Sequence, residues 1–474
     1  VGGLLNDLAF LYHSSKNKEQ NKEIELIFVK VLEQLKYYGW VPGHSRGSIH
    51  NTGYSIKSFM SAMYLMRSVL KEKDLLDDVY ELCSWLTNAN ECLLLPPPNA
   101  DLDYFHTFSR EQLISHLLNK NINQRVYFVK AFSHFMSLRL SLQKKDNTDG
   151  FKYDGTAFHH YGHYPDYAVG AVRYASEIVS LFARSSFSIS KEGHQNLINA
   201  LLQMRIYSNT HDFPISASGR HPYKKWGLAK SKVENAFYYL TKAGSLDGKQ
   251  KLNSEVGKAY LRLYPKGNKN LLEELKKANI TAENSPEGHW AMNNAANSIH
   301  RRKDWMVNIK GFSKYVWNAE TWNNANRYGV FQSHGAVDIL LKNGLKGSGY
   351  NENGWDWSRQ PGTTAIHMPL KMLNASITPH KNKKSSETFV GGVSFNGKQG
   401  VFGMVLSDDF FNLKARKSVF SFDNRIICLG SQISSWNQNY DTETILFQNH
   451  LDEKQLLTEP NVIKDNFGVQ MISL

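Results

Sequence analysis

The chain has 474 residues, of which 41% are hydrophobic and 21% charged, so intrinsic disorder is excluded for most of its length. No apolar run approaches the ~20 residues of a membrane-spanning helix. The three cysteines are too few for a disulfide-stapled scaffold and lack metal-ligand spacing. The chain carries 56 Lys and Arg against 43 Asp and Glu, a net charge of +13. That excess favours an anionic partner such as nucleic acid, anionic lipid or acidic polysaccharide, although a basic surface without a specific partner fits equally well.

The first part of the chain predicts helices. Apolar residues recur at helical spacing from Ile24 to Leu35 and from Ile56 to Leu70. Further helical stretches are expected near 123–143, 168–183, 191–207, 232–243 and 252–263. Helices of similar length joined by polar loops indicate paired helices in a solenoid or a toroid.

The pattern changes after a polar linker that runs from Asn279 to Gly288. Apolar and polar residues then alternate with a period of two, as in Met306 to Phe312, which predicts strands. The dipeptide Asn396-Gly397 lies between two such segments and is a strong signal for a type I′ hairpin. The second part is therefore expected to form an antiparallel sheet assembly.

The densest group of chemically active residues is the run from Phe158 to Tyr167, which holds three His and three Tyr. His acts as a base near neutral pH, and Tyr acts as an acid or, when its pKa is lowered, as a base. His159, His160 and His163 also allow a metal site, although their spacing differs from the common zinc motifs. The structural alternative is an aromatic loop that packs beneath the helices.

Other polar clusters have similar chemistry. Arg220 lies in a Gly- and Pro-containing turn, where a guanidinium group suits capture of a carboxylate or a sulfate. The stretch from Trp317 to Gly335 is rich in amide and aromatic groups, as in a sugar-binding cleft, and includes Glu320. Two smaller clusters span Ser48 to Tyr54 and Asn353 to Thr364. Because acids are scarce in this set, it suits removal of a proton next to a carboxylate better than glycoside hydrolysis by two carboxylates.

These clusters occur in the same order in polysaccharide lyase family 8, which the chain resembles over roughly residues 45 to 450. Besides the His/Tyr run, the resemblance rests on Asp154-Gly155-Thr156-Ala157, Gly219-Arg220-His221-Pro222, Asn326-Arg327-Tyr328-Gly329, Gln332-Ser333-His334-Gly335 and Gly354-Trp355-Asp356-Trp357-Ser358-Arg359. Within the family, the chain is most similar to the broad-specificity chondroitin sulfate ABC lyases, which Asp101-Leu102-Asp103-Tyr104-Phe105 also resembles.

The resemblance implies an α+β multidomain fold and an eliminative reaction. An α/α toroid, an incomplete barrel of helix pairs, is expected over residues 1–280 as the catalytic domain. An antiparallel β-sandwich assembly, truncated relative to the family, is expected over residues 281–474. The implied activity is β-elimination at the uronic acid of chondroitin sulfate and dermatan sulfate, which leaves unsaturated oligosaccharides or disaccharides.

The resemblance also implies roles for individual residues. His160 and Tyr167 match the catalytic His and Tyr, Arg220 the site Arg, and Glu320 the Glu that supports them. His50 matches a second His, which the ABC lyases use for the iduronate epimer of dermatan sulfate. Substrate-binding roles are expected for Asn51, His159, Asn326, Arg327, Trp355 and Arg359.

Two departures from the family pattern bear on specificity. This chain has His159 where members of the subgroup carry Arg before the catalytic His. Hyaluronate and chondroitin AC lyases rely on an Asn in the N-terminal helical part, and here Asn51 directly follows His50. Either of these neighbours could be the functional residue, so the epimer preference stays open. The alternatives are a hyaluronate or chondroitin AC-type lyase and a non-catalytic glycosaminoglycan-binding protein.

The same resemblance implies how the protein is used. No cofactor is expected to be required, although a divalent cation (Ca²⁺ or Mg²⁺) is a candidate activator without an assignable ligand cluster. The expected partner is an anionic glycosaminoglycan rather than nucleic acid or a membrane, and the expected state is a monomer. The substrate places the protein in the bacterial periplasm or outside the cell.

Overall fold

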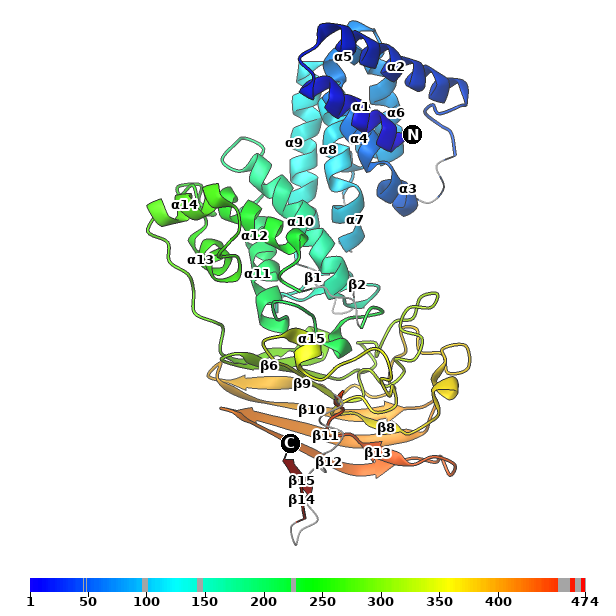
Figure 1. Ribbon diagram of the computed structural model, residues 1–474, viewed down its shortest axis with the longest axis vertical. Coiled ribbons are helices and arrows are strands. Elements are labelled where there is room, and N and C mark those ends of the chain that lie inside the picture. Colours follow the sequence, from blue (N-terminus) through cyan, green and yellow to red (C-terminus); the bar gives the residue numbers. More distant parts are fainter. Residues whose placement is uncertain are drawn as a thin grey trace.

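The computed structural model describes residues 1–45, 47, 49–95, 101–142, 148–222 and 227–450, and the backbone of residues 461–464 and 470–473. The side chains of Ile49 and His50 lie outside this description. Figure 1 shows the helices gathered at one end of the molecule and the long antiparallel strands at the other. Within the described residues, no helix is long and apolar enough to cross a membrane.

The helical part follows the predicted periodicity closely. Its helices are α1 (Gly2–Ser14), α2 (Lys18–Tyr37), α3 (Ile49–Ser55), α4 (Lys57–Leu65), α5 (Arg67–Glu72), α6 (Leu76–Thr87), α7 (Leu102–Thr107), α8 (Ser109–Leu118), α9 (Ile122–Arg139), α10 (Pro165–Phe182), α11 (Lys191–Tyr207), α12 (Ser231–Ala243), α13 (Ser254–Leu263) and α14 (Lys269–Lys277). Short 3₁₀ turns are η1 (Ala89–Leu93) and η2 (Ile215–Ala217).

Successive helices pack as pairs around two apolar cores. One core joins α1, α2, α4 and α6, and the other extends from α7 through α13. Helix α10 lies at the centre of the second core and packs against α7 and α12. It can do so because small and branched residues, such as Ala168, Val169 and Val172, line its buried side. The helix pairs do not close a barrel among the described residues, which confirms the predicted open toroid.

The sheet part contains two four-stranded antiparallel sheets. The first has the order β4 (Gly288–Met292), β5 (Asn297–Arg302), β6 (Trp305–Lys310), β7 (Ala336–Leu340). The second has the order β12 (Arg425–Ser434), β11 (Leu413–Phe422), β10 (Gln399–Asp408), β9 (Val390–Phe395). Smaller pairs join β8 (Thr364–Ile366) to β13 (Thr442–Thr444) and β14 (Asn461–Lys464) to β15 (Gln470–Ser473). Short turns of helix are η3 (Asn293–Ala295), α15 (Gly344–Gly347) and η4 (Leu370–Leu373).

The two large sheets pack face to face, and the β4–β7 sheet forms the middle layer between the second sheet and the helices. Val307 and Ile309 on β6 point into a core shared with Phe402 and Met404 on β10. On the opposite face of the same strand, Met306 joins the core of the helical part. The turn between β9 and β10 has positive φ at Asn396 and Gly397, as a type I′ hairpin requires. The predicted β-sandwich assembly is therefore confirmed.

Buried polar contacts fix the helical part on the middle sheet. The carboxylate of Asp338 on β7 accepts hydrogen bonds from the backbone N–H (3.0 Å) and the hydroxyl of Ser216 in η2. Asn308 on β6 also donates to the Ser216 hydroxyl (2.9 Å). Arg301 on β5 donates to the carbonyls of Ile206 and Ser208, which end α11. These bonds set the position of the loop that follows η2 and carries Arg220.

Candidate active site

The first site element is a tight hairpin between β2 (Ala157–His159) and β3 (Gly162–His163), in which β2 also pairs with β1 (Gly150–Phe151). Its two turn residues, His160 and Tyr161, have φ of 51° and 66°, a left-handed conformation that costs non-glycine residues about 1–3 kcal/mol each. Asp149 holds this turn, because its carboxylate accepts the backbone N–H of His160 (3.2 Å) and of Tyr161 (2.8 Å). Trp317 donates from Nε1 to the His160 carbonyl (2.9 Å). The strained turn is thus fixed from both sides.

Glu320 is the centre of the site. Its side chain is 2% exposed, and Oε1 accepts a hydrogen bond from His160 Nδ1 at 2.7 Å. Its other oxygen, Oε2, accepts from the Tyr164 hydroxyl (2.7 Å) and from Arg220 Nη1 (3.3 Å). Burial alone would raise the pKa of Glu320, but the His160 and Tyr164 hydrogen bonds outweigh it and hold the pKa below its usual range. A carboxylate that accepts from Nδ1 leaves His160 Nε2 as the nitrogen that can take up a proton.

Tyr167 and Arg220 form the other half of the site. Tyr167 lies in the first turn of α10, and Arg220 Nη2 donates to its hydroxyl oxygen at 2.6 Å. Burial raises the pKa of Tyr167 to about 12, while the Arg220 guanidinium opposes that rise. Arg220 therefore bridges the phenol to the Glu320 carboxylate. His160, Tyr167, Arg220 and Glu320, which the sequence predicted as catalytic, lie in one hydrogen-bonded network.

Tyr164 is a member of this network that the sequence analysis missed. It precedes Tyr167 by three residues in the same His/Tyr run, so its position in that run was the only signal for it. Its ring is fully buried, and its oxygen also lies 3.3 Å from the Arg220 backbone N–H, which donates to it. Burial strongly raises the pKa of its hydroxyl, so Tyr164 stays protonated and acts as a donor to Glu320.

Asn326 supports the network from behind. Its side chain is 7% exposed, and its amide nitrogen donates to the carbonyls of Gly219 (3.2 Å) and Glu320 (3.1 Å) and to Gln332 Oε1 (2.7 Å). Gln332 in turn donates to the Ile215 carbonyl (2.6 Å). Asn326 was predicted to bind substrate, and its position suits a residue that fixes the backbone beside Arg220 and Glu320.

The other predicted substrate-binding residues are spread around the site. A cleft of about 760 Å³ lies beside Arg220, and its lining includes His221, Arg327, Trp355 and Trp357. Trp355 is largely buried and stacks on Tyr350, with 4.8 Å between ring centroids. Arg359 instead pairs with Glu443, where its Nε lies 2.8 Å from Oε2.

Helix α3 carries His50 and Asn51. The His50 side chain lies outside the described residues, so its predicted role stays a prediction. Asn51 is exposed. α3 packs closely on α7, because Gly53 lies so near Thr107 and Phe108 that a Cβ there would be 2.7 Å from the Thr107 Cβ. From the same helix, Tyr54 donates its hydroxyl to Asp103 on α7.

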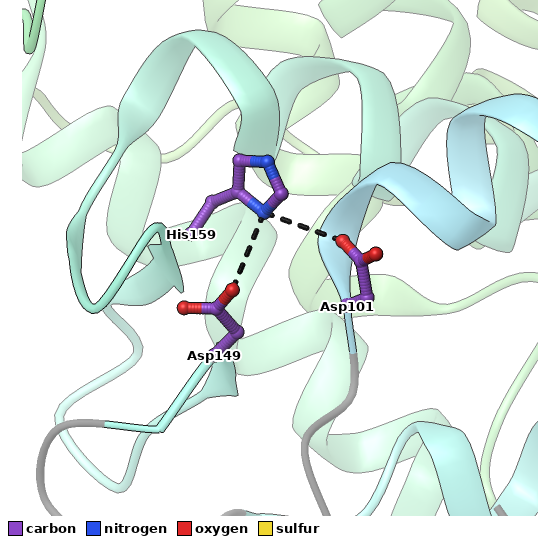
Figure 2. A group of neighbouring side chains, drawn as sticks. All are labelled: Asp101, Asp149 and His159. Carbon is purple, nitrogen blue, oxygen red and sulfur yellow. Dashed lines mark ion pairs between the residues drawn. The ribbon is translucent and has the colours of Figure 1, made fainter. Parts of the chain in front are cut away.

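His159 packs against the rings of His160 and Tyr167. It is 5% exposed, and its Nδ1 is 3.3 Å from Asp101 Oδ1 and 3.5 Å from Asp149 Oδ2 (Figure 2). Among the described residues, these three form the group that could hold a cation, since one ligand atom from each lies within 4.8 Å of the others. His163 does not join them: it packs on Tyr207 and hydrogen-bonds the Ala157 carbonyl (3.2 Å). A buried His159 suits support of the neighbouring rings better than the predicted contact with a polysaccharide.

Sequence comparison shows which proteins share this arrangement. The family model for the catalytic lyase domain matches residues 2–270, and that for the super-sandwich domain of polysaccharide lyase family 8 matches residues 287–468. The chain is 32% identical to the chondroitin sulfate ABC exolyase of Bacteroides thetaiotaomicron over 95% of this chain and 47% of that protein. It is also 32% identical to the chondroitin sulfate ABC endolyase of Proteus vulgaris over 94% of this chain and 44% of that protein.

The chain thus spans about half the length of these curated relatives. A comparison of folds also finds a match. The solved structure of the Streptomyces coelicolor chondroitin AC lyase in complex with chondroitin sulphate matches with a TM-score of 0.72 and 15% identity, and covers 98% of this chain and 65% of that chain. That likeness concerns the fold, whereas the two family models cover both parts of the sequence. The chain belongs to polysaccharide lyase family 8.

Proposed function

We propose that this chain is the catalytic part of a glycosaminoglycan lyase that cleaves chondroitin sulfate and dermatan sulfate by β-elimination at the uronic acid. The observation that carries the proposal is the network in which Glu320 holds His160 and Arg220, while Arg220 holds the Tyr167 hydroxyl. The relatives named above are ABC-type chondroitin sulfate lyases, which supports the substrate class. The net charge of +13 supports an anionic polymer as substrate.

The proposed reaction breaks the C5–H bond and the C4–O bond of the uronate. Asn51, with nearby positive groups, neutralises the uronate carboxylate, and a preorganised donor of this kind is worth roughly 3–4 kcal/mol. On glucuronate, Tyr167 or His160 removes the C5 proton, and the electron pair forms the C4–C5 double bond. The leaving glycosidic oxygen takes a proton from Tyr167. Each positioned acid or base contributes about 10²–10⁴-fold.

Arg220 and Glu320 support the two groups that move protons, Tyr167 and His160. Arg220 lies 2.6 Å from the Tyr167 oxygen, so its charge favours the tyrosinate form and can reach the bridging oxygen. Glu320 fixes the ring of His160 with Nε2 free. For iduronate the C5 proton lies on the opposite face. We propose His50 as the base there, because α3 packs on α7, and α7 contacts β2 and α10.

The proposal extends to how the protein is organised and used. Residues 1–280 form the catalytic toroid and residues 281–474 the sandwich, with the site between them. The reaction needs no cofactor, although Ca²⁺ or Mg²⁺ is a candidate activator. The protein acts as a monomer on polysaccharide in the bacterial periplasm or outside the cell.

The test is the growth of ultraviolet absorbance from the unsaturated uronate, with chondroitin sulfate and dermatan sulfate in parallel. Tyr167→Phe should fold normally and lose cleavage of both substrates. The matched control is Tyr153→Phe, whose side chain is 74% exposed and should keep activity. Near-normal turnover by Tyr167→Phe would refute the mechanism.

The substrate pair also decides between the alternatives. His50→Ala should spare chondroitin sulfate and lower turnover of dermatan sulfate, and equal loss on both would refute the two-base scheme. Cleavage of chondroitin sulfate alone by the unmodified chain would indicate an AC-type lyase. Binding of both polymers without cleavage would indicate a glycosaminoglycan-binding protein.

A further inference from the structure

His159 lies at the end of β2, directly before the strained turn that carries His160. Its Nδ1 faces two carboxylates that come from separate elements: Asp101 caps the N-terminus of α7, and Asp149 precedes β1 (Figure 2). Asp149 is also the residue that holds the turn N–H groups of His160 and Tyr161. His159 therefore ties α7 and the turn together through two partly buried acids.

The ring of His159 also contacts both groups that would move protons. Its centroid lies 4.0 Å from the ring of His160, at an interplanar angle of 31°, and 4.0 Å from the ring of Tyr167, at 43°. The rings of His160 and Tyr167 are themselves 5.5 Å apart. His159 thus packs against both rings and restricts how each can tilt.

The charged groups that act most strongly on His159 are acidic. Asp101 and Asp149 face its Nδ1, Asp103 lies on the first turn of α7, and His160, Tyr164 and Tyr167 complete the titratable groups around the ring. Burial would lower the pKa of His159, but the two carboxylates outweigh burial and raise the pKa to about 9. The imidazole is therefore a cation at neutral pH, and it offsets acids that would otherwise oppose ionisation of Tyr167.

We propose that His159 is a positioning residue of the lyase reaction, whose buried imidazolium fixes the rings of His160 and Tyr167 and offsets Asp101 and Asp149 where Tyr167 must carry negative charge. The inference rests on the proposed function. It gives His159 a role without contact to the polysaccharide, and it assigns Asp101 and Asp149 to the support of a catalytic tyrosine.

The test compares His159→Gln with His159→Arg. Gln is neutral and leaves both acids uncompensated, so kcat should fall by about 10- to 100-fold with KM changed less than about threefold. Without the cation the Tyr167 hydroxyl ionises less readily, so the optimum of the kcat–pH profile should move to higher pH by about one unit. Arg restores a permanent cation that can pair with both carboxylates, so His159→Arg should recover most of the kcat and the original profile.

The matched control is His334→Gln, which removes a buried histidine that hydrogen-bonds Asp408 (2.9 Å) and packs against Phe312 and Phe331 in the sandwich core. It should lower the melting temperature and leave kcat and the pH profile unchanged. Unchanged kcat in a folded His159→Gln would overturn the inference, as would a rise in KM alone, which would mark a substrate contact. A metal site would be indicated instead, and the inference overturned, if Ca²⁺ or Mg²⁺ restored the kcat of His159→Gln while His159→Arg stayed as slow as His159→Gln. If the unmodified chain were inactive, the proposed function and this inference would both be refuted. If the unmodified chain were active and His159→Gln kept its kcat, only this inference would be refuted.

Discussion

Replacing Glu320 with Gln is the sharpest test of the network, because the carboxylate accepts three hydrogen bonds and the amide cannot. Oε1 of the carboxylate serves His160, and Oε2 serves Tyr164 and Arg220. Gln has one acceptor oxygen and one donor NH₂ group. If the oxygen faces His160, the NH₂ group faces two donors, and the Arg220 cation loses its buried partner.

The size of the effect follows from burial. Removing one partner of a buried ion pair costs about 3–5 kcal/mol, and Glu320 is 2% exposed against 14% for Arg220. We therefore expect Glu320→Gln to lower the free energy of unfolding by about 3 kcal/mol. Because His160 loses its fixed tautomer and Arg220 moves off Tyr167, kcat should fall by about 10³-fold, which equals about 4 kcal/mol in the barrier.

The loss of stability in Glu320→Gln should also depend on pH. The pKa of Glu320 is lowered in the folded protein, so its contribution to stability is present above the pKa of the unfolded chain and is lost as pH falls through the folded value. The difference in unfolding free energy between Glu320→Gln and the unmodified chain should shrink at acid pH. Urea unfolding at several pH values measures it.

The control for Glu320→Gln is Glu283→Gln. Glu283 follows α14 and pairs with Arg205 of α11 (3.0 Å) and Arg262 of α13 (2.8 Å). Its replacement therefore also removes a carboxylate that two guanidinium groups share. It should destabilise the fold and leave kcat intact. Turnover by Glu320→Gln within threefold of the unmodified chain, or loss matching that of Glu283→Gln, would refute the reasoning.

Two further predictions concern packing and buried charge. In Gly162→Ala the new Cβ would lie 2.1 Å from the Trp317 ring, so Trp317 must move off the His160 carbonyl. Stability should fall by about 1–3 kcal/mol with a drop in kcat, and unchanged thermal unfolding and kcat would contradict this. Burial lowers the pKa of Lys310 to about 7, so the unfolded chain binds one more proton than the folded chain between about pH 7 and 10. Lys310 should therefore make stability rise with pH by about 1.4 kcal/mol per unit in this window. Urea unfolding of Lys310→Met should show a slope smaller by that amount, and an unchanged slope would count against it.

Much of the fold was predictable because its signals are local. The helices of the first part follow an apolar period that lies within each segment, and Asn396-Gly397 specifies its hairpin by the φ angles that it tolerates. The residue types of the catalytic set were also visible, since the run from Phe158 to Tyr167 concentrates them. What the sequence alone could not place was the partner of each: His160 and Glu320 are 160 residues apart and meet only through the packing of two parts.

The roles of the supporting residues were hidden for a related reason. Asn326 and His159 look like ligand-binding residues in a sequence, because polar side chains next to a catalytic motif are usually exposed. Their burial follows from the backbone around them: Asn326 turns inward toward the Gly219 carbonyl, and His159 turns inward toward two acids. The resemblance to the family predicted which residues are catalytic, whereas burial and hydrogen bonding separate the residues that face the cleft from those that hold them in place.

The site depends on the junction of the two parts rather than on either part. His160, Tyr167 and Arg220 come from the helical part, whereas Glu320 comes from the sheet part, so neither contains the whole network. The loop of Arg220 is in turn fixed by the hydrogen bonds that Ser216 donates to the carboxylate of Asp338. Burial raises the pKa of Asp338 even though four hydrogen bonds favour its ionised form. Burial of such a group costs free energy, and its bonds to Ser216, in the turn that precedes Arg220, give a physical reason for burying it. The polar contacts of the junction therefore hold the network together, since a small shift of one part on the other would separate Glu320 from both His160 and Arg220.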